Sequence, residues 1–245
     1  MPDLPLVIAS ALAVLLASTT QGATGFGFVI VSAPVMAVYL DPKLVVPVVL
    51  VLGVALGVPL MVHTRREFSI RRVWPMMLAG AAFTPIGTLV LTRLDAPQIK
   101  ILLGLVAGAV SLALLFGFQR EARNQRLASI PVGAASGLLT GATGLAGAPV
   151  ILFFANQGVE QRQFRADIVY YLQAVSFSAL PSYIVAGVLT AEAVRLAAVL
   201  LPAGVVGVSV GMWLSGRIPA LLFRRIALGI VLSAAAIAVS SGVTG

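Results

Sequence analysis

The longest apolar run of the sequence, residues 4–40, is interrupted by the stretch Ser18-Thr19-Thr20-Gln21-Gly22-Ala23-Thr24-Gly25-Phe26-Gly27. A continuous helix over that run would be roughly 55 Å long at ~1.5 Å per residue, too long for one untilted crossing of a ~30 Å hydrocarbon core. Glycine is the poorest helix former after proline. The stretch therefore predicts two short helices that meet at a Gly/Thr turn inside the protein, where buried polar side chains satisfy the freed backbone groups.

A second long run, residues 128–155, carries a similar interruption: Ser136-Gly137-Leu138-Leu139-Thr140-Gly141-Ala142-Thr143-Gly144-Leu145-Ala146-Gly147. The tetrapeptide Gly-Ala-Thr-Gly of the first run, which begins at Gly22, recurs here letter for letter. We therefore expect a second broken helix. In both cases the chain returns to the side from which it came, and whether each hairpin is re-entrant or fully spanning stays open.

The remaining long apolar runs have the length of membrane-crossing helices. Only 10% of the residues are charged, whereas soluble domains carry about 25%, and the mean hydropathy is +1.07. The runs are apolar on every face, which does not fit the alternation of a membrane β-barrel. The sequence predicts an all-α integral membrane protein with 8–10 membrane segments, of which six follow from the runs 44–62, 73–92, 101–118, 168–189, 196–214 and 226–243.

The chain also repeats itself at larger scale. Two arginines and two glycines of the first half recur in the second half at one fixed offset: Arg71, Gly80, Gly87 and Arg93 correspond to Arg195, Gly204, Gly211 and Arg217. A single such pair is expected by chance in a chain with 24 glycines, but four in one register favour a duplication. We interpret residues 1–124 and 125–245 as two repeats of one transmembrane domain, each a broken-helix hairpin followed by three helices.

The basic residues predict how the repeats are oriented. Cytoplasmic loops are enriched in Lys and Arg, and two returning hairpins with six single crossings place twelve of the sixteen basic residues on one side. Arg71 then lies inside and its counterpart Arg195 outside, so the repeats have inverted topology, as in many secondary transporters. Both termini are expected on the non-cytoplasmic side.

A helix break inside the membrane offers a binding site for an anion. The N-terminal end of a half-helix carries free N–H donors and about half a positive charge. The alternative is that the small residues only let helices pack closely. The candidate substrate-binding residues are Gln21, Gly22, Thr24, Gly25, Gly27, Thr140, Gly141, Thr143, Gly144 and Gln173.

The residues that the sequence lacks narrow the function further. All eight acidic residues fall at predicted helix ends or in loops, so no carboxylate is expected within the membrane and a cation carrier is disfavoured. The chain has no Cys, no paired intramembrane aspartates and no zinc-protease motif, so we expect neither an enzyme, a metal site nor a cofactor. The net charge of +8 is spread over short loops, which does not indicate nucleic-acid binding.

The two glycine-rich stretches, each followed by a proline (Pro34 and Pro149), resemble those of the TauE/SafE-type sulfite exporter family. The resemblance spans essentially the whole chain. It implies a permease or exporter that carries sulfite, organosulfonates or related small inorganic or organic anions across a bacterial inner membrane. The helix breaks predict that the substrate binds at the midplane between the two broken helices. The alternatives are a passive anion channel and a lipid scramblase. Membrane lipid is an expected partner, and a homo-oligomer stays open.

Overall fold

The computed structural model describes residues 3–116, 125–145, 147–155 and 160–215, together with 229, 232, 233 and 235–240. These residues contain helices and no strand, which confirms the predicted all-α class. The helices are α1 (Leu4–Thr24), α2 (Phe28–Ala37), α3 (Pro42–Thr64), α4 (Ile70–Arg93), α5 (Ala96–Phe116), α6 (Gln125–Thr143), α7 (Ala148–Ala155), α8 (Gln161–Val185) and α9 (Ala191–Leu214).

Five helices of the described ranges have the length and apolar composition needed to cross a membrane: α1, α3, α4, α8 and α9. The helices α2 and α7 have 10 and 8 residues, about half of the ~20 that a crossing requires. Half of the predicted run 226–243 lies outside the described residues. The chain is therefore a membrane protein with several apolar spanning helices.

Both predicted helix breaks are present. α1 ends at Gly25 (φ 89°), and α2 begins after Gly27 (φ 101°). α6 ends before Gly144 (φ 75°). These left-handed backbone angles are strained for any residue with a side chain, so the glycines fix where each helix stops.

The prediction that each long run forms two short helices was wrong in one respect. α1 has 21 residues and is a full membrane-length helix, so each hairpin joins one long and one short helix instead of two short ones. The second hairpin is likewise unequal, because α6 has 19 residues and α7 has 8. In each case the long helix ends at the threonine of the Gly-Ala-Thr-Gly tetrapeptide, and the glycine that follows forms the break.

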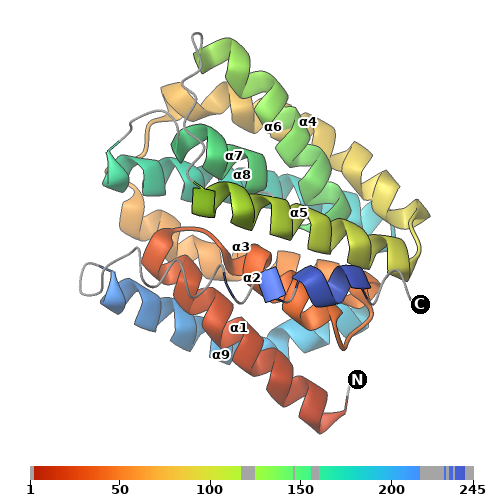
Figure 1. Cartoon of the computed structure of the whole chain (residues 1–245). Helices are drawn as coiled ribbons and strands as arrows, with labels where there is room; N and C mark the ends of the chain where they lie inside the picture. The colour runs from red at the N-terminus through yellow and green to blue at the C-terminus, as the bar shows by residue number, and fades with distance from the viewer. Residues whose placement is uncertain are drawn as a thin grey trace.

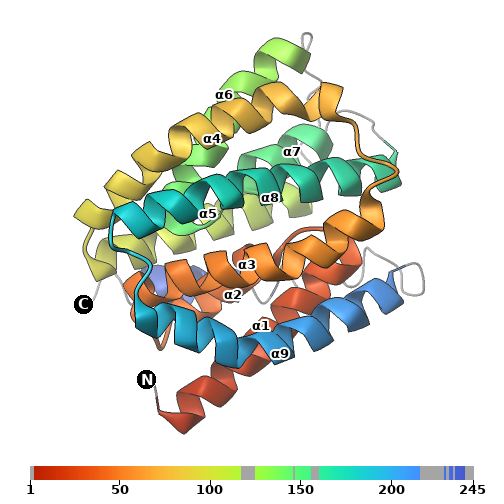
Figure 2. The ribbon, with the colours of Figure 1, turned by 180° about the vertical axis from the view of Figure 1, so that it is seen from behind.

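Figures 1 and 2 show how the helices are arranged. α1 and α9 lie side by side along one edge of the bundle, and α4 and α6 lie side by side along the opposite edge. α3 and α8 run between these two pairs, together with the short helices α2 and α7 and with α5. The short helices are thus enclosed by long ones, which shields their unpaired backbone groups from lipid.

Glycines let each edge pair approach to backbone contact. A methyl group added at Gly22 of α1 would overlap the backbone of α9 at Val208, and one at Gly141 of α6 would overlap the backbone of α4 at Thr84. Close approach through small residues is a main source of helix association in lipid. The pairs α1–α9 and α4–α6 are therefore tightly packed units.

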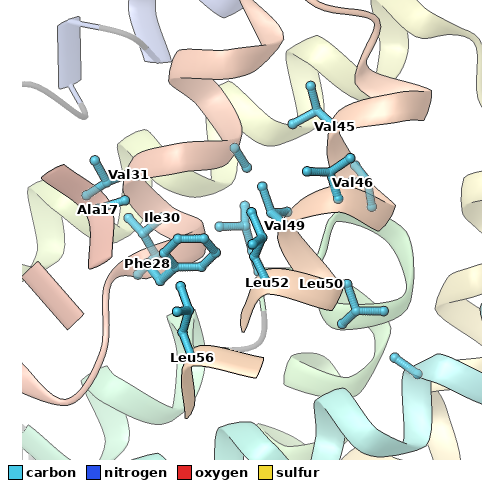
Figure 3. Close-up of a cluster of buried hydrophobic side chains, with 14 of the residues drawn as sticks. Ala17, Phe28, Ile30, Val31, Val45, Val46, Val49, Leu50, Leu52 and Leu56 are labelled. Atoms are coloured by element: carbon cyan, nitrogen blue, oxygen red, sulfur yellow. The ribbon is translucent and has the colours of Figure 1, made fainter. Parts of the chain in front are cut away.

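The short helix α2 is held by an apolar core. Figure 3 shows Phe28 of α2 facing Val and Leu side chains of α3, while Ile30 and Val31 of α2 lie beside Ala17 of α1. Phe28 and Val31 are each only 2% exposed, and Val49 of α3 is fully buried. This packing fixes the position of the first turn of α2, which forms part of the pocket described next.

One sequence expectation about the charged residues was wrong. α8 begins at Gln161, seven residues before the predicted run, so Asp167 lies inside this helix and not in a loop. Asp167 is fully buried, its Oδ2 lies 2.6 Å from Nη1 of Arg72, and its Oδ1 accepts a hydrogen bond from the backbone N–H of Ser69. Asp167 therefore lies in the second turn of α8, where a charge pair and a hydrogen bond satisfy its carboxylate.

Candidate functional site

A pocket lies between the two helix breaks. Its walls come from the end of α1, the break and first turn of α2, the middle of α3, the break before α7 and the middle of α8. None of the described residues that line it is charged. The lining residues are Gln21, Phe26, Gly27, Phe28, Val29, Ile30, Gly53, Gly144, Leu145, Gly147, Leu172, Gln173 and Ser176.

The pocket lies halfway along the two central helices. Gly53 is the middle residue of α3, which runs from Pro42 to Thr64, and Gln173 is the middle residue of α8. Gly53 leaves space there, because the nearest atoms to a Cβ at this position, from Phe28 and Val29, are 3.8 and 3.9 Å away. The pocket therefore lies equally far from both ends of α3 and α8 along the chain.

The N-terminal ends of both short helices reach the pocket. The carbonyl of Gly27 accepts the first helical bond of α2 from the N–H of Val31, and the carbonyl of Gly147 accepts that of α7 from Ile151. Both glycines line the pocket. The N–H groups of the first turn have no acceptor within their helix, and the helix dipole adds partial positive charge at this end. The pocket is therefore neutral in formal charge but electropositive.

Gln21 gives the pocket an unsatisfied polar group. The residue is only 7% exposed, lines the pocket, and its Oε1 has no hydrogen-bond partner. Leaving a buried polar atom unpaired costs about 1–3 kcal/mol, so such atoms in native proteins call for an explanation. A half-turn of the amide presents the NH₂ group in place of the oxygen. Gln21 can therefore meet either a donor or an acceptor that enters the pocket.

Gln173 lies across the pocket from α1 and is fixed in place. Its Nε2 donates to the backbone carbonyl of Val54 at 2.9 Å, and its amide packs against Gly57, where an added Cβ would overlap it. The side chain is only 3% exposed. Gln173 thus joins α8 to α3 at the level of the pocket that it lines.

The hydroxyls of Thr24 and Thr143 bond to their own helix ends. Thr24 Oγ1 lies 2.8 Å from the carbonyl of Thr20, and Thr143 Oγ1 donates to the carbonyl of Leu139 at 2.7 Å. Each also accepts a hydrogen bond from the backbone N–H two residues later, Phe26 in one case and Leu145 in the other. The two threonines occupy matching positions at the breaks, and neither lines the pocket.

The remaining predicted residues lie in the walls behind the pocket. Gly22 and Gly141 form the close contacts of α1 with α9 and of α6 with α4. Thr140 is fully buried and donates to the carbonyl of Ser136 at 2.7 Å, and its own carbonyl accepts a bond from the Tyr183 hydroxyl. Of the ten predicted residues, the structure brings four to the pocket surface: Gln21, Gly27, Gly144 and Gln173.

Sequence reasoning missed several lining residues, among them Gly53, Ser176 and Gly147. Ser176 follows Gln173 by three positions and so shares its helix face, a spacing that could have identified it. Gly147 belongs to the second glycine-rich stretch and begins α7. Gly53 is a single glycine in an apolar run, and nothing in the sequence distinguishes it from glycines that only pack.

Comparison with curated proteins and with solved structures gives no match for the chain. A protein-family model does match: that of the sulfite exporter TauE/SafE family, over residues 10–238. This range includes both helix breaks and every residue that lines the pocket. The match covers nearly the whole chain, and its members are transporters rather than enzymes. The chain therefore belongs to the sulfite exporter TauE/SafE family of transmembrane transporters.

Proposed function

We propose that this chain is a secondary transporter of small anions such as sulfite or organosulfonates, and that the anion binds in the pocket between the two breaks. The observation that carries the proposal is the unpaired Oε1 of Gln21 beside two half-helix N-termini in a pocket without charged side chains. Backbone N–H groups at helix N-termini favour negative charge. The membrane is taken to be a bacterial inner membrane, as the family resemblance implies.

The size of the pocket supports a compact substrate. The space open to the centres of water-sized groups is ≈ 40 Å³, whereas one water needs about 10–15 Å³ by the same measure. Such a space suits an oxyanion of a few heavy atoms. The apolar part of the wall, which includes Val29, Ile30 and Leu172, offers a short organic tail a dry surface.

Two inverted repeats form part of the proposal. The contact of Gly22 with Val208 has a counterpart in the contact of Gly141 with Thr84, with the partners exchanged between the halves. Gly22 and Gly141 begin the shared tetrapeptide, and Val208 follows Thr84 by 124 positions, the offset of the repeat. A pseudo-twofold axis in the membrane plane would relate these contacts, and it supports alternating access about a central pocket.

The proposed orientation places both termini outside the cytoplasm. A reporter that is active only in the cytoplasm is expected to be inactive when fused after Gly245 and active when inserted in the segment 119–127. The reason is the concentration of Lys and Arg in that segment and in the others assigned to the cytoplasmic side. Activity at Gly245 would reverse the orientation.

The substrate class is tested with purified protein in liposomes. We expect sulfite and sulfoacetate to be taken up with saturation and counterflow, and an uncharged sulfone of similar size to be excluded, because helix N-termini select negative charge. Sulfate serves as a doubly charged comparison. Equal uptake of the sulfone would contradict the anion site, and conductance that does not saturate would identify a channel instead of a carrier.

A further inference from the structure

Arg165 is the feature of the fold that the proposed pocket does not use. The sequence placed it in a loop, but it lies in the first turns of α8. Its Nη1 donates to the hydroxyl of Ser215 at 2.7 Å, and its Nη2 donates to the backbone carbonyl of Gly22 at 2.5 Å. Its Nε is buried and has no partner. One guanidinium thus joins the start of α8 to the end of α1 and to the residue after α9.

The guanidinium is held by neutral groups only. Among the residues that the structure describes, no carboxylate contacts Arg165, and its acceptors are a carbonyl and a hydroxyl. The nearest acid in the chain, Asp167, is two positions further along the helix and therefore points elsewhere. Asp167 is already bound to Arg72 and Ser69. A guanidinium binds oxyanions through paired, charge-assisted hydrogen bonds that are about twice as strong as neutral ones.

Arg165 borders the wall of the pocket. Gly22, which accepts its hydrogen bond, directly follows the pocket residue Gln21. The stem of Arg165 lies against Gly25 at the break, where an added Cβ would be 2.6 Å from its Cγ. The preceding residue, Phe164, packs edge to face on the pocket residue Phe26, with 6.2 Å between the ring centres. Residues 164 and 165 together therefore cover the first break.

Among the residues that the structure describes, the closest contacts of the glycine at the second break are apolar side chains and a backbone carbonyl. Val169 of α8 lies beside Gly25, and Val49 of α3 lies beside Gly144, at 3.4 and 3.6 Å from an added Cβ. Apolar contacts lie at the second break, whereas the half-buried guanidinium of Arg165 lies at the first. The two sides of the pocket therefore differ in how they respond to an anion.

We infer that Arg165 is a second anion-binding residue, and that an anion which binds it breaks the Arg165 latch, meaning its two hydrogen bonds to Gly22 and Ser215. The inference rests on the proposed function, since the anion is the one that the pocket takes. The anion replaces two neutral acceptors at the guanidinium, which frees the end of α1 from α8 and α9 and opens the first break. A ligand that binds the open state better shifts the population toward it.

The test uses the absence of Cys from the chain. V169C, in the otherwise unchanged full chain, reports opening of the first break through its labelling rate with a membrane-impermeant maleimide in vesicles of either orientation. V49C reports the second break. Sulfoacetate is the anion, because sulfite would consume the maleimide. R165Q removes the charge at the latch, and R162Q removes an exposed charge from the same helix turn as the control.

Sulfoacetate is expected to raise V169C labelling several-fold, from one side of the membrane, when Arg165 is present. Without any anion, R165Q should raise the labelling rate of V169C about tenfold, because the open state changes from a minor to the main population. R165Q should also abolish the response of this labelling rate to sulfoacetate. R162Q and V49C should show neither change. If liposomes take up sulfoacetate but the labelling rate of V169C does not change with sulfoacetate, the latch is overturned and the proposed function is not. This comparison does not need R165Q, so it holds even if R165Q fails to fold. Absence of uptake of every anion in liposomes would overturn the proposed function instead.

Discussion

Replacing Gly141 with alanine is expected to lower the thermal stability of the purified protein strongly. The added methyl would overlap the carbonyl of Thr84 and lie 2.7 Å from the carbonyl carbon of Gly87. Both atoms belong to the backbone of α4, so no side chain can rotate away. Overpacking of a tight interior costs about 1–3 kcal/mol and more when the backbone must move.

The measurement is the unfolding midpoint in detergent, with the yield of monodisperse protein as a second readout. Gly108 offers the matched control, because a Cβ there would meet nothing nearer than the Cβ of Ala235 at 3.7 Å, an ordinary contact. Gly22→Ala should behave like Gly141→Ala, since it overlaps the carbonyl of Val208 in α9. A Gly141→Ala protein as stable as Gly108→Ala would show that α4 and α6 are less closely packed than described.

The helix breaks could be predicted from the sequence because their cause is local. Glycine at positions 25, 27 and 144 adopts backbone angles that other residues avoid, and no distant contact is needed to recognise a Gly-Ala-Thr-Gly stretch inside an apolar run. The start of α8 could not be predicted in the same way. Polar and charged residues from Gln161 to Asp167 look like a loop until their partners on other helices are known.

The sequence predicted part of the candidate site correctly, because some polar residues are recognisable from their apolar neighbours alone. Gln21 and Gln173 stand out as amides in apolar surroundings, and both line the pocket. The threonines were expected to bind substrate because a hydroxyl at a break suits that role. The structure shows that Thr24 and Thr143 already bond to their own helix ends. Which of two possible partners a hydroxyl takes depends on angles that the sequence does not specify.

Gln21→Leu is expected to remove transport without harming the fold. In the proposed site this amide donates to the anion, and hydrogen bonds to charged groups contribute about 1.5–3 kcal/mol. Their loss corresponds to binding that is weaker by about 10- to 100-fold, since each 1.4 kcal/mol is a factor of ten. Leucine has a similar size and leaves no unpaired atom. Because Oε1 of Gln21 now has no partner, the stability of the empty protein should stay unchanged or rise.

Gln173→Leu provides the contrast that makes this prediction specific. It also removes an amide from the pocket, but it leaves the carbonyl of Val54 without the donor that now lies 2.9 Å away. That loss should lower the unfolding midpoint, so weaker uptake is accompanied by weaker folding. Thr24→Val and Thr143→Val should likewise act mainly on stability, by about 1 kcal/mol for each lost hydrogen bond. Uptake of sulfite by reconstituted protein and the unfolding midpoint without anion are measured for all four variants. A lower unfolding midpoint in Gln21→Leu, or an unchanged affinity for sulfite, would contradict the assignment of Gln21 as a substrate-binding residue. An amide with a structural role affects the unfolding midpoint, whereas an amide that binds only the substrate affects uptake alone.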